Sequence, residues 1–551
     1  MKDEMRPAQT ILTTTILYAF TQAALAQQSA QSLQENGQRA LREPTPAAPL
    51  PLPPPAPPAT IPPGGLTVTL KQVTISGNSL IPQEELVAAL GPAIGQTFDF
   101  AGLNALADKL SAYYRNAGYP FARAYLPQQD LQQGSLRIEV LEGRYGAITT
   151  HGDKNLAPAA QRFLSPLKPG SVIESHQLER VTLILDDQPG VRSTPVVRPG
   201  KDVGTGDLAI KVQRDHRYAG EIGVDNNGTR YTGRNRAHAN LDIDSPFTLG
   251  DQLSFQGMYT NEQMWFGSAS YAIPLSASGL RGRVGYNRSY YALADSFAAL
   301  NASGTAKVSS AGLSYPLVRS QRRNVTLSAM LEHKRLRDQQ GATNTGSDKF
   351  SNSVPLAVNF DMRDTLLRGG VTYGALTWTS GRLNLDDAQL ATDSATARSD
   401  GQFNKVNLDL ARIQSVAEHF DVYGRISAQW ASKNLDSSQK FGLGGRNGVR
   451  AYPSGEGYGD AGVMAQVELR YAFGSLMPYV FYDVGRITSN RDPWTSEINH
   501  RTLAGAGLGL RYDDRAFNAS LIAARRTVGG PARSEPHESQ TTVWVNVGYR
   551  F

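Results

Sequence analysis

The residues that most often carry enzyme chemistry are scattered through this chain. Its eight histidines show no H-E-x-x-H pattern and no other paired spacing that would bind a metal. Neither a phosphate-binding P-loop nor a G-x-S-x-G nucleophile elbow occurs. The absence of cysteine excludes thiol catalysis, disulfides and cysteine-ligated metals. We therefore predict a protein that is not an enzyme and has no catalytic, cofactor or metal site. Composition alone leaves open a hydrolase embedded in a barrel, which needs only Ser and His.

The most informative segment is a long glycine-rich connection at residues 433–461. Its centre, from Phe441 to Pro453, reads FGLGGRNGVRAYP. Connections longer than about 12 to 15 residues without secondary structure of their own are usually functional. The glycines permit backbone turns that other side chains forbid, and they flank Arg450 and Tyr452.

A second group of residues lies shortly downstream. Phe481, Asp483 and Gly485 alternate along the chain, so they share one face of the strand expected at 477–488. If the connection folds over that face, the guanidinium of Arg450 meets the carboxylate of Asp483. Removing one partner of a buried ion pair costs about 3 to 5 kcal/mol, whereas an exposed pair contributes less than about 1 kcal/mol. We predict that this pair anchors the connection; a solvated pair is the alternative.

Alternating segments fill the chain after Arg214, and each is bounded by Gly, Asn, Asp, Ser or Pro. Their lengths match the roughly 9 to 11 residues of a tilted membrane strand, and their number is even. We therefore predict a transmembrane β-barrel of 16 antiparallel strands at residues 215–551. The expected strands lie near residues 218–226, 235–244, 251–260, 264–274, 281–291, 304–316, 323–335, 353–363, 370–380, 402–414, 419–432, 462–473, 477–488, 502–512, 516–526 and 541–551.

The last expected strand has a lipid face and a lumen face. The first face carries Val543, Val545, Val547, Tyr549 and Phe551, and the second carries Thr542, Trp544, Asn546, Gly548 and Arg550. Three other glycines, Gly505, Gly507 and Gly509, recur with the period of two of a strand. We attribute these three to close packing in the barrel rather than to dinucleotide binding.

The overall composition agrees with a barrel. No stretch approaches the roughly 20 apolar residues of a membrane-spanning helix. The mean hydropathy of −0.35 is low, as expected when half of each strand faces a wet lumen. The net charge of +6 is small for 551 residues and no basic run occurs, so we do not expect a nucleic-acid partner.

Two stretches before the barrel repeat one order of elements, strand-helix-helix-strand-strand. Residues 66–145 form the first expected α+β domain, and residues 146–214 form a weaker copy of it. In the first domain the expected helices are 82–90 and 100–116, and the later strands are 122–126 and 136–141. In the second, the helices are 157–164 and 175–185, and the later strands are 194–198 and 207–213.

The N-terminal region is expected to contain three segments. Residues 1–26 have the charged start, apolar stretch and small residues of a secretory signal peptide, with cleavage between Ala26 and Gln27. Residues 27–43 are polar and allow a short helix. In residues 44–65, 11 of 22 residues are proline, which predicts an extended linker rather than helix or sheet.

These features together resemble a known family. Val449, Arg450, Ala451 and Tyr452 are similar to the V-R-G-Y/F tip of a lumen-folded loop in outer-membrane transporters that combine POTRA domains with a 16-stranded barrel. The group of Phe481, Asp483 and Gly485 is similar to their strand motif.

Further segments resemble the TpsB branch, the haemolysin/haemagglutinin activators of the ShlB/FhaC/HecB type. They are residues 118–127, residues 136–143, Asp225-Asn226-Asn227-Gly228 and Tyr231-Thr232-Gly233. The resemblance covers nearly the whole expected mature chain. One departure is Ala451, which replaces the family glycine, and alanine tolerates a positive φ poorly.

The resemblance implies an outer-membrane transporter of a two-partner, type V, secretion system, with its two POTRA domains in the periplasm. It implies that these domains recognise the N-terminal secretion domain of an unfolded, TpsA-like exoprotein, which crosses the barrel without nucleotide. It also implies that residues 27–43 plug the pore at rest; a disordered leader is the alternative. Further expected partners are outer-membrane lipid and, during biogenesis, periplasmic chaperones and the barrel-assembly machinery.

Two other functions stay open at this point. An assembly factor that inserts other barrel proteins shares POTRA domains and the loop motif, but usually has more POTRA domains and lacks a proline-rich leader. A passive porin does not explain the two repeated domains.

Overall fold

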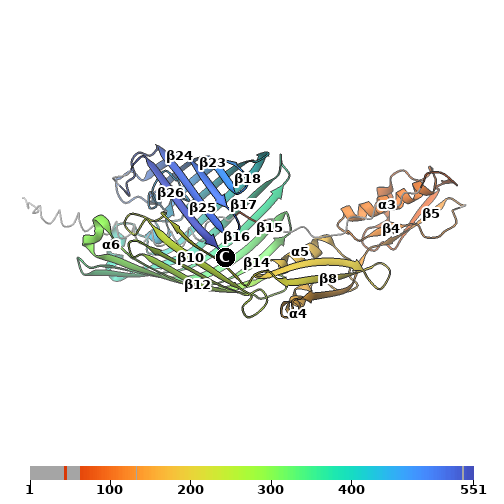
Figure 1. Ribbon diagram of the computed structural model, residues 1–551, viewed down its shortest axis with the longest axis horizontal. Helices are drawn as coiled ribbons and strands as arrows, with labels where there is room; N and C mark the ends of the chain where they lie inside the picture. Colours follow the sequence, from red (N-terminus) through yellow and green to blue (C-terminus); the bar gives the residue numbers. More distant parts are fainter. Residues whose placement is uncertain (1–42, 46–61, 132, 536–538) are drawn as a thin grey trace, which may run out of the picture.

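The computed structural model describes residues 43–45, 62–131, 133–535 and 539–551 (Figure 1). The expected signal peptide, its cleavage position between Ala26 and Gln27, residues 27–42 of the expected plug and most of the proline-rich linker lie outside these ranges. No helix in the described part of the chain is long and apolar enough to cross a membrane.

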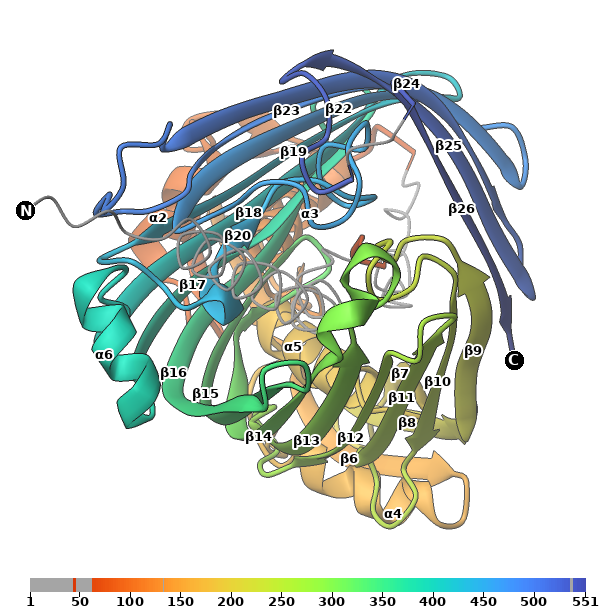
Figure 2. The same ribbon diagram turned by 90° about the vertical axis from the view of Figure 1, so that its left-hand side faces the viewer.

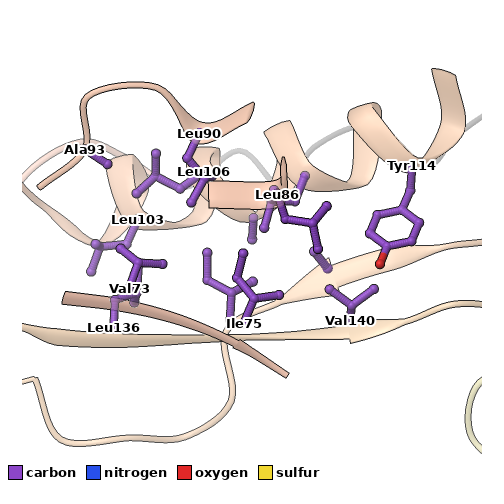
Figure 3. Close-up of a cluster of buried hydrophobic side chains, with 14 of the residues drawn as sticks. Val73, Ile75, Leu86, Leu90, Ala93, Leu103, Leu106, Tyr114, Leu136 and Val140 are labelled. Carbon is purple, nitrogen blue, oxygen red and sulfur yellow. The ribbon is translucent and has the colours of Figure 1, made fainter. Parts of the chain in front are cut away.

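The first unit is a three-stranded sheet covered by two helices. The apolar positions of both helices face the sheet, and Leu86 and Leu136 are fully buried between the layers (Figure 3). Leu110 of the longer helix is fully buried as well. Asp99 begins the longer helix by accepting a hydrogen bond from Gly102 N at 2.8 Å, and this bond lowers the pKa of Asp99. The elements are β1 (Val68–Thr69), β2 (Gln72–Ser76), α2 (Gln83–Leu90), β3 (Thr97–Phe98), α3 (Phe100–Asn116), β4 (Arg123–Tyr125) and β5 (Ser135–Leu141).

The second unit repeats this arrangement. In the first unit β5 lies between β2, which is parallel to it, and β4, which is antiparallel; β8 lies in the same way between β6 and β7. The expectation of two α+β repeats in the order β-α-α-β-β is therefore confirmed. The elements are β6 (Arg144–Gly152), α4 (Leu156–Ala160), the 3-10 helix η1 (Gln161–Leu164), α5 (Ser175–Asp186), β7 (Val191–Pro199) and β8 (Thr205–Arg214).

Sixteen antiparallel strands form a closed barrel in which β26 pairs with β9. This confirms the predicted barrel and its strand number. The strands are β9 (Tyr218–Asp225), β10 (Arg236–Asp244), β11 (Gln252–Thr260), β12 (Trp265–Pro274), β13 (Arg281–Ala292), β14 (Ala302–Arg319), β15 (Arg323–Gln340), β16 (Thr345–Asp364), β17 (Gly370–Asn384), β18 (Gly401–Ala417), β19 (Phe420–Ala431), β22 (Ala461–Tyr471), β23 (Leu476–Thr488), β24 (His500–Asp513), β25 (Phe517–Val528) and β26 (Thr541–Arg550).

The two faces of the barrel wall follow the alternation in the sequence. On β26, Val543, Val545 and Val547 are exposed on the exterior, whereas Trp544 is 3% exposed and faces the lumen. Five strands, β14 to β18, are longer than expected and reach up to 20 residues. β14 and β18 are longer at both ends, whereas the extra residues of β15, β16 and β17 lie mostly at the end of the barrel that is away from the two units.

The second unit is fixed to the barrel at the opposite end, which we call the proximal end (Figure 1). Leu249, in the turn between β10 and β11, is 3% exposed and belongs to the apolar core of the second unit. Arg180 of α5 donates to Pro316 O at 2.7 Å, and Arg319 of β14 contacts Asp187 at 2.6 Å. These contacts place the second unit against the barrel, and the first unit lies beyond it (Figure 1).

Candidate functional site

The connection at 433–461 folds back into the lumen of the barrel. Two short strands, β20 (Phe441–Gly442) and β21 (Tyr458–Gly459), pair as a hairpin, which Figure 2 shows inside the ring of barrel strands. The segment between them carries the four predicted tip residues. Each of Val449, Arg450, Ala451 and Tyr452 is at most 3% exposed. The long loop is therefore part of the packed interior.

The structure brings Arg450 and Asp483 together in a buried pair. Arg450 donates three hydrogen bonds to the Asp483 carboxylate: N and Nε to Oδ2, at 3.0 and 2.9 Å, and Nη2 to Oδ1, at 2.7 Å. Asp483 is 0% exposed and Arg450 is 3% exposed. Such forked, charge-assisted bonds fix geometry as well as charge. The loop tip is thus held against β23.

Arg450 also reaches a neighbouring strand. Its Nη1 lies 2.5 Å from Oε1 of Glu468 on β22, and its guanidinium lies 3.6 Å from the ring centre of Phe481. Glu468 contacts two more cations, Arg470 at 2.8 Å and Arg511 at 3.0 Å. The two carboxylates therefore face three guanidinium groups in one connected network.

Other strands of the barrel wall, β25 and β26, also bond to the tip of the loop. Trp544 Nε1 donates to Arg450 O at 2.8 Å, and Thr542 Oγ1 donates to Ala451 O at 2.9 Å. The Tyr452 hydroxyl donates to Val528 O at 2.7 Å. Together with the pair above, these bonds attach the tip to four strands: β22, β23, β25 and β26.

Glycines in the wall make room for the loop. A Cβ on Gly485 would lie 2.3 Å from Leu443 Cδ1, and Leu443 is a fully buried loop residue. On β24, a Cβ added to Gly505 would meet the side chain of Ala451, and a Cβ added to Gly507 would meet the ring of Phe481. Gly485 and Gly505 therefore permit close packing of the loop against the wall, and Gly507 permits close packing of the Phe481 ring.

Ala451 causes no backbone strain. It is not among the described residues with a positive φ, so the expected conflict with the family glycine does not arise. Its methyl group instead occupies space beside Gly505, where a Cβ would lie 2.2 Å from the Cβ of Ala451. The alanine at the tip and the glycine in the wall are therefore complementary in size.

This complementarity predicts the effect of a methyl group on the wall. Gly505→Ala is expected to destabilise loop docking by about 1 to 3 kcal/mol, as overpacking of a core does. Adding Ala451→Gly should restore most of the loss, because it removes the clashing methyl group. Protease sensitivity of the loop in the two single variants and the double variant measures the coupling. Strictly additive effects would show that the two residues do not share the space.

Sequence reasoning missed a buried carboxylate that belongs to the loop itself, Glu456. It is 1% exposed and accepts hydrogen bonds from the backbone N–H groups of Arg533 and Ser534, at 2.9 and 2.8 Å, and from Arg501. Arg533 and Ser534 belong to the connection between β25 and β26. Glu456 thus ties the loop to another connection at the end of the barrel opposite the proximal end. No spacing in the sequence indicates this contact.

A cavity of about 580 Å³ remains beside the loop. Arg446 of the loop lines one side, and Asp225, His238 and Asp409 of the barrel wall line the others. Polar and charged groups of both signs therefore surround the space next to the loop. In the described ranges, no three His, Asp or Glu side chains gather as a metal site.

The described residues at the start of the linker lie at the proximal end of the barrel. Arg363, near the end of β16, donates a hydrogen bond to Pro44 O. At the other end of the linker, Gly64 N donates to Asp99 of the first unit at 2.8 Å. The two described ends of the linker therefore lie at the barrel opening and at the first unit.

Both the barrel and the first unit match models of known families. A family model for haemolysin secretion/activation protein ShlB/FhaC/HecB matches residues 204–512. A model for the POTRA domain, ShlB-type, matches residues 68–143.

Several curated proteins are similar over most of their length. The heme/hemopexin transporter protein HuxB of Haemophilus influenzae (strain 86-028NP) is 28% identical over 472 residues, which cover 82% of this chain and 83% of that protein. The outer membrane transporter CdiB of Dickeya dadantii is 23% identical over 502 residues, 88% of this chain and 86% of that protein.

Solved structures share the fold. CdiB from Escherichia coli matches with a TM-score of 0.74 at 22% identity, and the match covers 96% of this chain and 98% of that chain. BamA from Haemophilus ducreyi lacking POTRA domains 1–3 matches less closely, with a TM-score of 0.52 at 14% identity, over 88% of this chain and all of that chain.

Proposed function

This chain belongs to the haemolysin secretion/activation protein family ShlB/FhaC/HecB, and from that membership we propose how its parts carry out two-partner secretion. The protein is an outer-membrane transporter, and its POTRA domains lie in the periplasm. Its partner is a cognate secreted polypeptide. In our proposal this exoprotein arrives unfolded, binds the POTRA domains through its N-terminal secretion domain, and crosses the barrel without nucleotide and without a catalysed reaction.

Recognition is proposed to occur by strand addition to a POTRA sheet, in which main-chain hydrogen bonds give affinity and alternate side chains give specificity. Such addition needs a sheet edge with free N–H and C=O groups. Each of the two sheets has two edges, so the four edge strands β2, β4, β6 and β7 are the candidates.

Three of these edges are already occupied or blocked. Ser111 Oγ accepts from Ala124 N on β4 at 2.9 Å. On β6, the carboxamide of Gln161 bonds to Ile148 O and Thr150 N, both at 2.9 Å. On β7, Asp186 accepts from Ser193 N at 2.8 Å, and two prolines, Pro195 and Pro199, have no N–H to offer.

The edge of β2 lacks the side-chain hydrogen bonds that Gln161 makes to the edge of β6. Gly77 and Gly152 end the two strands alike, since a Cβ on either would meet the carbonyl of Val140 or Val212. With this alignment Ile75 corresponds to Thr150. At the offset of Gln161, which is exposed, α2 has Leu86, which is fully buried in the core of the first unit. Leucine cannot bond to a strand edge. Within the described ranges no group outside the sheet bonds to Val73 or Ile75, and this supports β2 as the strand to which the exoprotein adds.

The pore is proposed to be closed at rest by the N-terminal segment. Pro44 lies at Arg363 at the proximal opening, so the segment before it starts beside the lumen. The folded-in loop fills another part of the lumen. We propose that binding of the exoprotein at the POTRA domains withdraws residues 27–43, while the anchor at Arg450 keeps the loop in place.

The function is tested by deleting the gene and measuring both secreted and outer-membrane proteins. We expect loss of one secreted protein with an unchanged set of barrel proteins. Broad loss of barrel proteins would instead favour an assembly factor, the alternative to which the match with BamA points. A plasmid copy of the wild-type gene should restore secretion of that one protein.

A further inference from the structure

A group of cations lies on the outer surface of the barrel, on β13, β14 and β15. We call it the β13–β15 patch; it consists of Arg288, Lys307, Arg335 and Arg337. All four are exposed. They alternate in phase with exposed apolar residues of the same strands, namely Val284 on β13, Leu313 on β14, and Leu327 and Leu331 on β15. The four side chains therefore point away from the lumen.

Three of the cations stand directly opposite one another. Arg288 pairs in register with Lys307, and Lys307 pairs in register with Arg335. The Cβ atoms of directly opposite residues lie about 4.5 to 5.5 Å apart, and like charges at such positions destabilise a sheet. A row of three cations in register therefore needs nearby anions to offset the repulsion between them.

The described residues of the chain supply too few anions. Asp348 on β16 contacts both Arg335 and Arg337, at 2.6 and 2.7 Å. In the described part of the chain no carboxylate pairs with Arg288 or Lys307; Arg288 lies 5.5 Å from the ring centre of Trp265. One carboxylate for four cations leaves an excess of positive charge on the patch.

The patch lies where the outer face stops being apolar. Along β15 the outward residues are Leu327, Ala329 and Leu331, and beyond His333 they become the two arginines. β15 has 18 residues, whereas a tilted strand crosses the lipid core in about 9 to 11. Because the proximal end faces the periplasm, the basic stretch lies at the headgroup level of the outer leaflet, next to the aromatic Tyr286 and Trp265.

We propose that the β13–β15 patch binds the phosphate groups of an anionic, phosphorylated glycolipid of the outer leaflet. Arginine binds phosphate through paired N–H groups, and lysine adds a point charge. A phosphate between two opposite cations replaces their repulsion by attraction. The proposal concerns how the barrel is seated in its membrane and does not depend on the secreted partner.

The experiment uses the full chain in a neutral detergent, with diphosphorylated lipid A as the probe and native mass spectrometry as the readout. Each cation near a charged lipid surface is expected to contribute about fivefold in affinity, so R288Q/K307Q should bind lipid A about 25-fold more weakly. The matched control is R486Q/R525Q, which removes two exposed arginines from the outer face of β23 and β25. Neither stands directly opposite another cation, so neither can share a phosphate in the way proposed for the patch, and this variant should bind almost as the wild type does.

Two further arms separate the sources of phosphate. Dephosphorylated lipid A should bind the wild type weakly, and millimolar inorganic phosphate should not displace lipid A. Equal losses in both double variants, or equal binding of the dephosphorylated lipid, would overturn the proposal. Displacement by inorganic phosphate would show a free-phosphate site instead. The single variant K307E provides an independent check, since charge reversal should weaken binding more than K307Q does.

Discussion

Arg450→Ala is expected to stop export of the exoprotein while the barrel stays folded in the outer membrane. The substitution leaves Asp483, which is 0% exposed, without its counterion, whereas Glu468 keeps Arg470 and Arg511. Removing one partner of a buried pair costs about 3 to 5 kcal/mol. This corresponds to roughly a hundredfold to several thousandfold loss of the docked loop. Secreted partner in the medium and heat-dependent migration of the barrel on a gel measure the two outcomes.

The same loop offers a matched control for this substitution. Arg446→Gln also removes a loop arginine, but the Arg446 side chain donates to a neutral group, Ser520 Oγ, at 2.8 Å. A neutral hydrogen bond contributes about 1 kcal/mol, so secretion should fall little. Asp483→Asn added to Arg450→Ala should recover part of the loop's protease resistance, because it removes the orphaned charge. Normal export by Arg450→Ala at wild-type protein levels would show that the pair is not an anchor.

The barrel could be predicted well because its physics is local. Lipid on one side and water on the other impose a period of two on each strand, so β26 was readable from Val543 to Phe551. The extra length of β14 to β18 was not readable in this way. Beyond the lipid both faces of a strand meet polar surroundings. The outward positions of β15 there carry Arg335 and Arg337 instead of apolar residues, so the alternation of apolar and polar residues is lost.

The site could be predicted only in part, for a related reason. Arg450 of the tip and Asp483 of the strand could be predicted to pair because their charges are opposite and because both match motifs of the family that the sequence resembles. Glu456 carries no such signal, because its donors are mainly backbone groups of a connection far along the chain. The fit between Ala451 and Gly505 depends on the path of the loop across β24, which no spacing in the sequence contains.

The edge of β2 is expected to contact the bound exoprotein, and single cysteines can test this because the chain has none of its own. Thr74 on β2 and Thr149 on β6 occupy equivalent positions in the two POTRA domains, since both lie three residues before Gly77 or Gly152. A photo-crosslinker on Thr74→Cys should capture the secretion domain of the partner. The same reagent on Thr149→Cys should not, because Gln161 already occupies that edge.

A side chain that bonds to the edge of β2 should weaken binding of the partner's secretion domain. Leu86→Gln puts a carboxamide at the same offset from Gly77 as Gln161 has from Gly152, and we expect it to turn out of the core and bond to the free groups of β2. Displacing a partner's two main-chain hydrogen bonds, at about 1 kcal/mol each, lowers affinity by about thirtyfold. Leu90→Gln, one turn along the same helix, makes the same change in the same core and controls for lost stability. If both variants bind the secretion domain equally, or if Thr149→Cys crosslinks as well as Thr74→Cys, recognition does not occur by strand addition at β2.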